Sequence, residues 1–456
     1  MNLHRLLAAR AAAGNPVRVG LIGAGKFGTM YLAQARTTPG VHVVSVADLE
    51  PERARQSFRQ TGWPEDQCGA ASLDDAHKHG ATFITEDAAA LIAADGIEVV
   101  VDATGDPGTG IRHALQSFDH AKHVVMVTVE GDALAGPLLA RRAAEAGVIY
   151  SLAYGDQPAI ICEMVDWARA NGFELVCAGR GVNYLPAYHD STPDTVWQHF
   201  SANLTAEDAA AAGMNPKMFN SFLDGTKPAI ETAAVANACG LIPQAEGLKF
   251  PPCGAEDLPQ VLRPVAEGGR LDHKGTVEVV SSLERDGRPV YRHLRWGVFV
   301  TFEAPGEYVA RCFRDYGLTT DDSGRYSALY REVHLIGLEL GTSVASVALR
   351  GEPTGCPRGF TADVTTTAKR DLKAGEVLDG EGGYTVYGRL MPAADSLALG
   401  ALPLGFAHGV KLKREIEKGE TVRWADVGFD EADDTVRFRR QMEAAFSPGL
   451  DTAAAD

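Results

Sequence analysis

The chain has 456 residues, too many for a single hydrophobic core, and this length favours about three domains. Hydrophobic residues make up 45% of it and charged residues 23%, a composition typical of a globular protein. The formal net charge of −17 argues against a nucleic acid or an anionic membrane surface as a partner.

Seven cysteines are dispersed along the chain without a C-x-x-C pair, and no apolar run reaches membrane-spanning length. An odd, scattered set of cysteines in a chain of this size is typical of reduced thiols. We therefore expect a cytoplasmic protein that does not bind a membrane. A homodimer is the expected assembly, since dimers are the commonest state of soluble oligomeric enzymes.

The first predicted elements are a buried strand from Val17 and a helix over Thr29–Arg36, joined by a glycine-rich turn. The turn contains Gly23, Gly25 and Gly28 in the spacing G-x-G-x-x-G. The first glycine permits the tight turn, the second lets the backbone approach a pyrophosphate, and the third lets helix and strand pack closely. Free N–H groups at the helix N-terminus then receive the phosphates. In this context the pattern predicts a dinucleotide-binding site.

A second apolar run over 41–47 follows the helix and ends at Asp48, which lies 20 residues after Gly28. A carboxylate at this position binds the ribose hydroxyls of an adenosine and repels a 2′-phosphate. Arg53 could offset that repulsion, or it could lie on the helix surface. The sequence therefore leaves the choice between NAD(H) and NADP(H) open.

The alternation of helices and strands continues to residue 155, which predicts a Rossmann-type doubly wound sheet over 1–155. The apolar run at 97–104 ends in a second glycine-rich turn, where ligands bind in such sheets. Further helices are expected over 51–60, 87–94 and 136–146, and further strands over 124–129 and 148–152. The predicted coenzyme-binding residues are Gly23, Gly25, Lys26, Phe27, Gly28, Asp48, Arg53, Thr104, Gly105 and Asp106.

A second domain, of α+β type, is predicted over 156–355, and a small β-rich domain over 356–456. The second domain begins at the hinge 154–158, and Asp286-Gly287 between two of its apolar runs is a hairpin signal. The expected elements of this domain are a helix over 159–171, strands over 173–179, 276–283 and 296–302, and a long helix over 326–349 that returns to the nucleotide domain. The prediction of the last domain rests on its short segments, which are interrupted by glycine and proline.

The segment from Asn215 to Glu231 holds the densest set of polar groups that could serve a nicotinamide enzyme. Such an enzyme needs a proton donor or acceptor near the carbon that exchanges hydride, and groups that hold the substrate. On a helix, Asp224, Lys227 and Glu231 would be offset by three and four positions and share one face. A lysine between two carboxylates could relay a proton or polarise a carbonyl, so these three residues are the predicted catalytic groups.

Gly225 and Pro228 weaken a continuous helix in this segment, and a helix that starts at Pro228 would leave Asp224 and Lys227 in the loop before it. Either geometry could bring the charged groups together. The alternative is a surface helix with ordinary ion pairs. His189 lies in a nearby loop, where a lone histidine is more often solvated. The predicted substrate-binding residues are Asp156, Arg180, Asn183, Asn215, Lys217, Asn220 and Ser221.

A metal site is not indicated by the spacing of the acidic residues and histidines. Asp156, Asp224 and Glu231 could hold a divalent ion together with water, but no pattern requires it, so no metal ligand is predicted. The expected partner is a small-molecule substrate, which could carry a phosphate group. A nucleic acid is not expected as a partner.

Four segments together resemble a known group of oxidoreductases: Arg18–Gly28, Tyr154–Pro158, Asp224–Lys227 and His334–Leu340. They are similar to the homoserine-dehydrogenase-like NAD(P) oxidoreductases that end in a SAF-type domain. Within these, the chain resembles the DXR-like (DRL) group, the second type of 1-deoxy-D-xylulose-5-phosphate reductoisomerase. The resemblance extends over nearly the whole chain and implies that the predicted β-rich domain is SAF-like.

The resemblance implies that the enzyme rearranges 1-deoxy-D-xylulose 5-phosphate to a branched aldehyde and reduces it with NADPH to 2-C-methyl-D-erythritol 4-phosphate, in isoprenoid precursor synthesis. In this hypothesis Lys227 polarises the carbonyl or donates the proton, and Asp224 and Glu231 orient it. The alternative is an NAD(P)-dependent dehydrogenase of a small hydroxy acid, sugar acid or homoserine. A third hypothesis, a nucleotide-sensing or scaffold protein, predicts coenzyme binding without turnover.

Overall fold

The computed structural model describes residues 2–200, 205–211 and 214–447. The chain forms two compact units, Met1–Ile160 with His334–Pro357, and Ile161–Val333 with Arg358–Asp456. The division into three domains over 1–155, 156–355 and 356–456 stays a prediction, and its last residues, 448–456, lie outside the described ones. None of the helices in the described part of the chain combines the length and the apolar character needed to cross a bilayer.

The first unit is built on a six-stranded parallel sheet in the order β3-β2-β1-β4-β5-β6. This is the strand order of a Rossmann fold, so the predicted doubly wound sheet is confirmed. Its central strands are almost wholly buried because helices cover both faces of the sheet. The strands are β1 (Val17–Ile22), β2 (Val41–Ala47), β3 (Phe83–Thr85), β4 (Val99–Asp102), β5 (His123–Met126) and β6 (Tyr150–Leu152).

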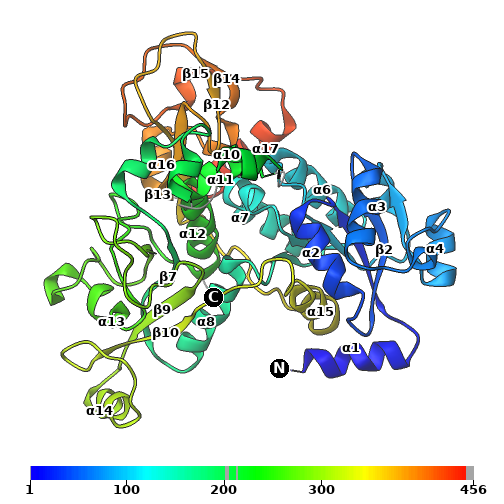
Figure 1. Cartoon of the computed structure of the whole chain (residues 1–456), viewed down its shortest axis with the longest axis horizontal. Coiled ribbons are helices and arrows are strands. Elements are labelled where there is room, and N and C mark those ends of the chain that lie inside the picture. The colour runs from blue at the N-terminus through cyan, green and yellow to red at the C-terminus, as the bar shows by residue number, and fades with distance from the viewer. Residues whose placement is uncertain (1, 201–204, 212–213, 448–456) are drawn as a thin grey trace. The chain divides into compact units, whose positions relative to one another are not determined.

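The helices of this unit come from both of its chain segments. Helix α15 (Gly341–Arg350) packs its buried face, which includes Val344 and Ala345, into the core beneath β1. It also lies beside α1 (Leu3–Ala12), as Figure 1 shows. The other helices are α2 (Lys26–Ala35), α3 (Pro51–Gln60), α4 (Leu73–His79), α5 (Ala88–Ala93), α6 (Pro107–Asp119) and α7 (Val129–Glu145).

The start predicted for α7 is wrong. The sequence favours a helix from Gly136, whereas the structure begins it at Val129 and places Gly136 and Pro137 inside it. A Cβ on Gly136 would lie 2.4 Å from Oδ1 of Asp132 and 3.1 Å from Cγ of Pro357, so a larger residue here would have to displace the buried carboxyl.

The second unit contains a four-stranded mixed sheet in the order β10-β9-β7-β8. Its strands are β7 (Glu174–Val182), β8 (Thr276–Ser281), β9 (Val298–Glu303) and β10 (Tyr326–Arg331). The predicted hairpin between β8 and β9 is wrong, because β7 lies between them, parallel to β8 and antiparallel to β9. The Asp286-Gly287 signal does form a short hairpin, in which Leu283 and Pro289 make an antiparallel bridge and the Gly287 N–H donates to the Glu284 carbonyl at 2.8 Å, but this hairpin does not pair β8 with β9.

The predicted long helix over 326–349 is also wrong. Its first part is the edge strand β10, and only its last part is helical, as α15. The two are separated by a loop in which Gly337 has a φ of +72°. That conformation is incompatible with a continuous right-handed helix and is easily adopted only by glycine.

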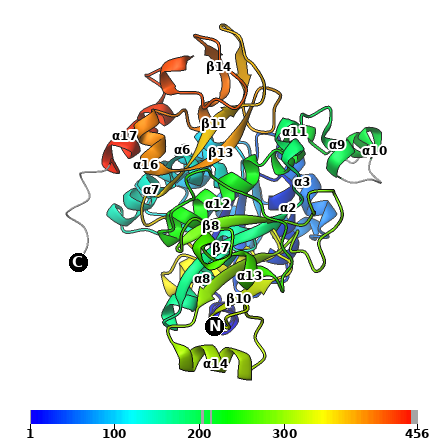
Figure 2. The ribbon, with the colours of Figure 1, turned by 90° about the vertical axis from the view of Figure 1, so that its left-hand side faces the viewer.

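The rest of the second unit joins the middle and the C-terminal parts of the chain. Helix α12 (Thr226–Cys239) packs against the antiparallel pair β11 (Ala362–Ala368) and β13 (Val386–Pro392), as Figure 2 shows. A second small sheet has the order β12-β14-β15. The remaining elements are α8 (Gln157–Ala170), which begins in the first unit, α9 (Val196–Phe200), α10 (Ala206–Ala211), α11 (Pro216–Leu223), α13 (Leu258–Val261), α14 (Glu307–Asp315), β12 (Val377–Asp379), β14 (His408–Leu412), β15 (Val427–Gly428), α16 (Ala393–Leu399) and α17 (Asp434–Ala445).

Candidate active site

The glycine-rich turn leads from β1 into α2, whose N-cap is Gly25. Gly23 has a φ of +99°, and a Cβ there would lie 2.5 Å from the Ala103 carbonyl oxygen. A Cβ on Gly28 would lie 2.3 Å from the Gly23 carbonyl oxygen. A Cβ on Gly25, in contrast, would meet no heavy atom within 4 Å. The turn is therefore tight on the protein side and open at its middle glycine, which fits a pyrophosphate at the N-terminus of α2.

Asp48, at the end of β2, is buried and is bonded to this turn. Its Oδ2 accepts the Ala24 N–H at 2.8 Å, and its Oδ1 accepts the Glu50 N–H at 2.9 Å. Arg53 lies beside two acids, since its Nη1 is 3.7 Å from Asp48 Oδ1 and its Nη2 is 2.9 Å from Glu50 Oε1. The local charge at the expected ribose position is thus negative, and Arg53 is partly neutralised.

The second predicted coenzyme segment, at the end of β4, is held by a buried carboxylate that the sequence analysis missed. Oδ1 of Asp102 accepts the hydroxyls of Thr104 and Thr128 at 2.9 and 2.6 Å, and Oδ2 lies 2.7 Å from Nδ1 of His113. The Gly105 N–H donates to the Thr128 hydroxyl at 3.1 Å. Asp102 is the last residue of a β-branched run, and this position could have identified it.

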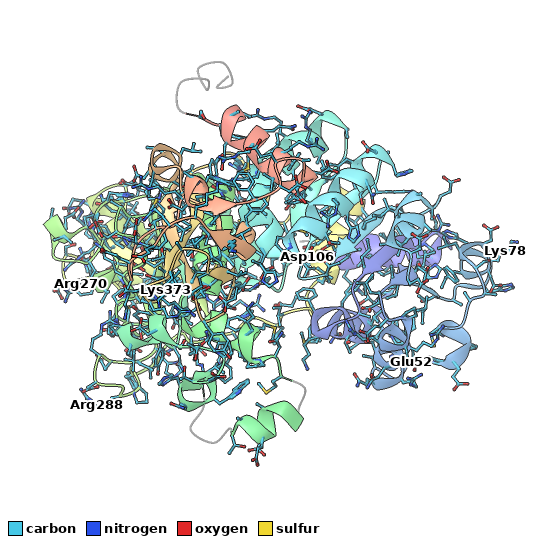
Figure 3. All side chains as sticks on the ribbon, turned by 90° about the horizontal axis from the view of Figure 1, so that it is seen from above. Glu52, Lys78, Asp106, Arg270, Arg288 and Lys373 are labelled. Carbon is cyan, nitrogen blue, oxygen red and sulfur yellow. The ribbon has the colours of Figure 1, made fainter. Side chains whose placement is uncertain are left out.

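Asp106, labelled in Figure 3, is exposed and caps α6 by accepting the Thr109 N–H at 2.7 Å. Its side chain thereby fixes the end of the same segment. Its contact with a coenzyme stays a prediction.

The hinge that follows β6 and the loop before α15 lie next to each other in the first unit. Asp156 and Gln157 are both buried, and Gln157 Nε2 lies 3.4 Å from Nδ1 of His334. The loop also reaches the coenzyme turn, because a Cβ on Gly337 would lie 3.0 Å from the Phe27 carbonyl oxygen. The structure therefore places His334 in a loop by the hinge, where the sequence had favoured a helix.

In the second unit, the three predicted catalytic residues do not share one helix. Asp224 is the C-cap of α11, Gly225 follows with a φ of +91°, and α12 begins at Thr226. Lys227 therefore lies in the first turn of α12 and is half-buried, whereas Asp224 precedes the helix. Of the two geometries that the sequence left open, the structure has the interrupted one: Gly225 breaks the helix, Asp224 precedes it, and it resumes at Thr226 rather than at Pro228.

Both predicted carboxylates have buried cationic partners. Asp224 is fully buried, and its Oδ2 lies 2.7 Å from Nζ of Lys369, which is 2% exposed. Glu231 forms an ion pair with the buried Arg180, a predicted substrate-binding residue. Lys369 lies far along the chain, just after β11, and no local pattern pointed to it.

A neutral hydrogen-bonded pair lies beside Asp224. His189 Nδ1 is 2.7 Å from the Asp224 carbonyl oxygen, and His189 Nε2 is 2.9 Å from the Tyr184 hydroxyl. Burial lowers the pKa of His189, and burial raises the pKa of Tyr184 to about 12. His189 is thus neutral, with Nδ1–H donating to the carbonyl and Nε2 accepting from Tyr184.

Most of the other predicted substrate-binding side chains are bonded to protein groups. Lys217 donates to the Asp379 carbonyl, and the fully buried Asn220 donates to the carbonyls of Ser191 and Gly382 at 3.0 and 2.9 Å. Ser221 donates to the Met218 carbonyl, Asn215 caps α11, and Asn183 accepts from Ser282. These bonds largely fasten α11 to the C-terminal segments, and the substrate contacts of these residues stay predictions.

A metal centre has no support in the described residues, among which no three His, Cys, Asp or Glu side chains are placed to hold an ion.

Comparison with known proteins gives two family matches. Residues 17–127 match the oxidoreductase family with an NAD-binding Rossmann fold, known as GFO/IDH/MocA. Residues 155–340 match the catalytic domain of the oxidoreductase DRL. No curated protein matches the chain.

Solved structures of low similarity also match. A probable dehydrogenase from Thermotoga maritima is 14% identical, with 74% of this chain and 90% of that chain covered and a TM-score of 0.36. An oxidoreductase from Agrobacterium radiobacter, in complex with NAD+, L-tartaric acid and magnesium, is 16% identical (37% and 45% covered, TM-score 0.28). Myo-inositol dehydrogenase from Lactobacillus casei, in complex with NAD(H) and myo-inositol, is 17% identical (40% and 50% covered, TM-score 0.28).

The chain spans about half the length of the last two structures, and at these TM-scores none of the three supports an inference about substrate. The family matches agree with the open glycine turn and the Rossmann strand order. The chain therefore combines a segment similar to the NAD-binding Rossmann domain of the GFO/IDH/MocA oxidoreductases with a segment similar to the DRL catalytic domain.

Proposed function

We propose that the protein is a dehydrogenase that transfers hydride between NAD(P) and a carbinol or carbonyl carbon of a small, oxygen-rich substrate such as a hydroxy acid or sugar acid. The observation that carries this proposal is the position of Lys227 in the first turn of α12, within the DRL-type catalytic segment. The coenzyme binds at the turn Gly23–Gly28 and supplies or accepts the hydride.

The N-terminal end of α12 suits the charge that develops in such a reaction. When hydride adds to a carbonyl carbon, negative charge appears on the oxygen, and the positive end of a helix dipole stabilises it. The Lys227 ammonium then donates a proton to that oxygen, and in the reverse direction the amine removes the hydroxyl proton. Lys227 is half-buried, so it combines access to substrate with partial exclusion of water.

Asp224 and Glu231 act in this proposal by fixing α12 rather than by moving protons. Oδ1 of Asp224 accepts the Thr226 N–H at 2.9 Å, at the first residue of the helix. Asp224 is paired with Lys369, and Glu231 with Arg180, and all four side chains are buried. Paired in this way, the two carboxylates set the position from which Lys227 projects.

A reductoisomerase acting on 1-deoxy-D-xylulose 5-phosphate is the second candidate, and the match of residues 155–340 to the DRL catalytic domain favours it. Here the skeleton rearranges before reduction, and Lys217, Asn220 and Ser221 with nearby arginines hold the phosphate. The relation to homoserine dehydrogenases, a SAF-like fold for 356–456 and a homodimer are parts of the same proposal.

Coenzyme binding and product identity test the two candidates together. The coenzyme is identified as the one of NAD and NADP that raises the thermal midpoint more. Turnover with it is then assayed on hydroxy acids, sugar acids and deoxyxylulose phosphate. A dehydrogenase gives the oxidised substrate with its carbon skeleton intact and needs no phosphate. A branched product formed only from the phosphorylated ketose would instead establish the reductoisomerase.

Lys227→Met tests the proposed proton transfer with whichever substrate is turned over. General acid–base catalysis is worth about 100-fold or more, so kcat should fall by at least that factor with coenzyme affinity unchanged. Lys373→Met is the matched control, because Lys373 is exposed in the C-terminal part (Figure 3). Normal turnover in the Lys227→Met variant would disprove the role of this lysine.

A further inference from the structure

Two cysteine thiols from different helices meet inside the second unit. Cys162 lies on α8 and Cys239 is the last residue of α12, and their sulfur atoms are 3.6 Å apart. Neither sulfur is part of a disulfide; Cys162 is half-buried and Cys239 is 5% exposed. A disulfide has an S–S length of about 2.05 Å, so the sulfurs need to approach by only about 1.6 Å to form one.

The surroundings of this thiol pair favour a thiolate at Cys239. The Cys162 thiol lowers the pKa of Cys239 by hydrogen bonding, and Arg169 and Arg358 act in the same direction against the effect of burial. Arg169 also donates to the Cys239 carbonyl at 2.7 Å, which fixes its guanidinium near the end of α12. Cys177 of the same unit differs, because burial raises the pKa of its thiol.

We propose that Cys162 and Cys239 are an oxidation site, at which a hydroperoxide converts the two thiols into a reversible disulfide. The Cys239 thiolate attacks one peroxide oxygen, an S–O bond forms as the O–O bond breaks, and the leaving oxygen departs as water or an alcohol. Cys162 sulfur then attacks the resulting sulfenic sulfur, an S–S bond replaces the S–O bond, and a second oxygen leaves as water. The two thiols together lose two electrons, which reduce one peroxide.

The bond would tie the C-terminal end of α12 to α8. Helix α12 carries Lys227 at its other end, and α8 is the helix through which the chain leaves the first unit. Oxidation would therefore restrict the helix that bears the proposed proton donor, and it lowers turnover without changing the coenzyme turn. This consequence rests on the proposed function, whereas the disulfide itself does not.

Mass spectrometry of the full chain tests the disulfide directly. The reduced protein is treated with one equivalent of hydrogen peroxide, its remaining thiols are alkylated, and the digest is searched for crosslinked peptides. We expect one dominant crosslink, between the peptides of Cys162 and Cys239, which dithiothreitol removes. No crosslink, or crosslinks distributed over other pairs such as Cys177 with Cys253, would overturn the proposal.

Variants identify the order of the two steps. In Cys162→Ser, dimedone should trap a sulfenic acid on Cys239, and no crosslink should form. Cys312→Ser is the matched control, since Cys312 is a half-buried thiol on α14, and this variant should keep the crosslink. Mapping on the unaltered chain needs no variant, so a folding defect in Cys162→Ser cannot hide the answer.

Turnover and coenzyme binding test the consequence separately. The oxidised protein should show a kcat lowered severalfold, restored by dithiothreitol, with unchanged NAD(P) affinity, and Cys239→Ser should resist this inhibition. A crosslink with unchanged kcat would disprove the inhibition. If no substrate is turned over at all, the proposed function fails, but the crosslink still decides whether the thiol pair is an oxidation site.

Discussion

The ammonium of Lys369 lies 2.7 Å from the carboxylate of Asp224, and both side chains are removed from solvent. Lys369 also donates to the carbonyls of Ser191 and Gly383, at 2.8 and 2.7 Å. One lysine from the C-terminal part of the chain therefore joins the loop before α9, the turn before α12 and the loop before β13. The C-terminal segments are thus structural parts of the unit that contains Lys227.

Replacing Lys369 by methionine should destabilise the second unit strongly. The change leaves the Asp224 carboxylate buried without its cation, which costs about 3–5 kcal/mol in comparable sites. Asp224→Asn in the same chain removes the charge, so the double variant should recover part of the loss. Urea denaturation measures both, and a double variant as unstable as Lys369→Met would show that the ion pair is not the cause.

Coenzyme choice should depend on the two acids around Arg53. Asp48 and Glu50 place negative charge at the expected ribose position, so we expect the protein to prefer NAD(H). In Asp48→Asn/Glu50→Gln, Arg53 loses its acidic partners and can bind a 2′-phosphate, while the introduced carboxamide keeps one acceptor oxygen for the turn. A charge-assisted hydrogen bond is worth about 1.5–3 kcal/mol, so the ratio of kcat/KM for NADP to that for NAD should rise about tenfold or more.

Arg55→Gln is a control for this experiment, because Arg55 is an exposed arginine of the same helix paired with Glu52. It should leave the ratio unchanged. An unaltered preference in the double variant would mean that another part of the coenzyme determines selection.

The pH dependence of stability should include a contribution from Asp132. This carboxyl is fully buried, its Oδ1 accepts the Tyr150 hydroxyl, and its Oδ2 has no hydrogen-bond partner. Burial raises the pKa of Asp132 from 3.8 to about 7, against the smaller opposing effect of the Tyr150 hydrogen bond. The folded state therefore holds a proton that the unfolded chain releases above about pH 4.

The stabilisation from this proton is complete below about pH 4 and is lost as the pH rises to about 7. A shift of this size corresponds to about 4 kcal/mol at most, by 1.36 kcal/mol per pH unit. Asp132→Asn cannot ionise, so its thermal midpoint relative to the unaltered protein should rise between pH 5 and pH 8. A constant difference over that range would show that Asp132 is already ionised at pH 5.

Local sequence patterns predicted the first unit well because its fold depends on short-range signals. Gly23 and Gly25 were predicted correctly to form a tight turn before a helix, although α2 starts at Lys26 rather than Thr29 and so contains Gly28. Helix α3 has the bounds that Pro51 and the pattern after it indicate. The parallel strands are continuous apolar runs, which the sequence displays directly. The predicted start of α7 at Gly136 was wrong because this glycine lies inside the helix, next to the buried carboxyl of Asp132.

The second unit was predicted less well because its pairings are long-range. Strand β7 pairs with β8 about a hundred residues later, and no turn signal shows that it separates β8 from β9. The partner of Asp224 is likewise Lys369, and the partner of Glu231 is Arg180. Sequence spacing identified the charged residues of the candidate site, but only the three-dimensional structure could show which cation faces which acid.

The loop that follows β4 should depend on Thr128. Its hydroxyl donates to the buried Asp102 at 2.6 Å and accepts the Gly105 N–H at 3.1 Å, so it connects the carboxylate to the glycine-rich segment. Thr128→Val keeps the shape of the side chain but removes both hydrogen bonds and leaves Asp102 with one acceptor site less satisfied. A buried polar group that loses its partner costs about 1–3 kcal/mol, so the thermal midpoint should fall and the KM for coenzyme should rise severalfold.

Two further variants distinguish an effect on the loop after β4 from an effect on the stability of the whole fold. Thr104→Val removes a hydrogen bond to Asp102 but leaves the Gly105 bond intact, so its effect on coenzyme KM should be the smaller of the two. Thr37→Val removes an exposed hydroxyl that donates to the Gln34 carbonyl, and neither property should change. If Thr128→Val lowers the thermal midpoint and leaves coenzyme KM unaltered, the Thr128 hydroxyl stabilises the fold around Asp102 and does not affect coenzyme binding.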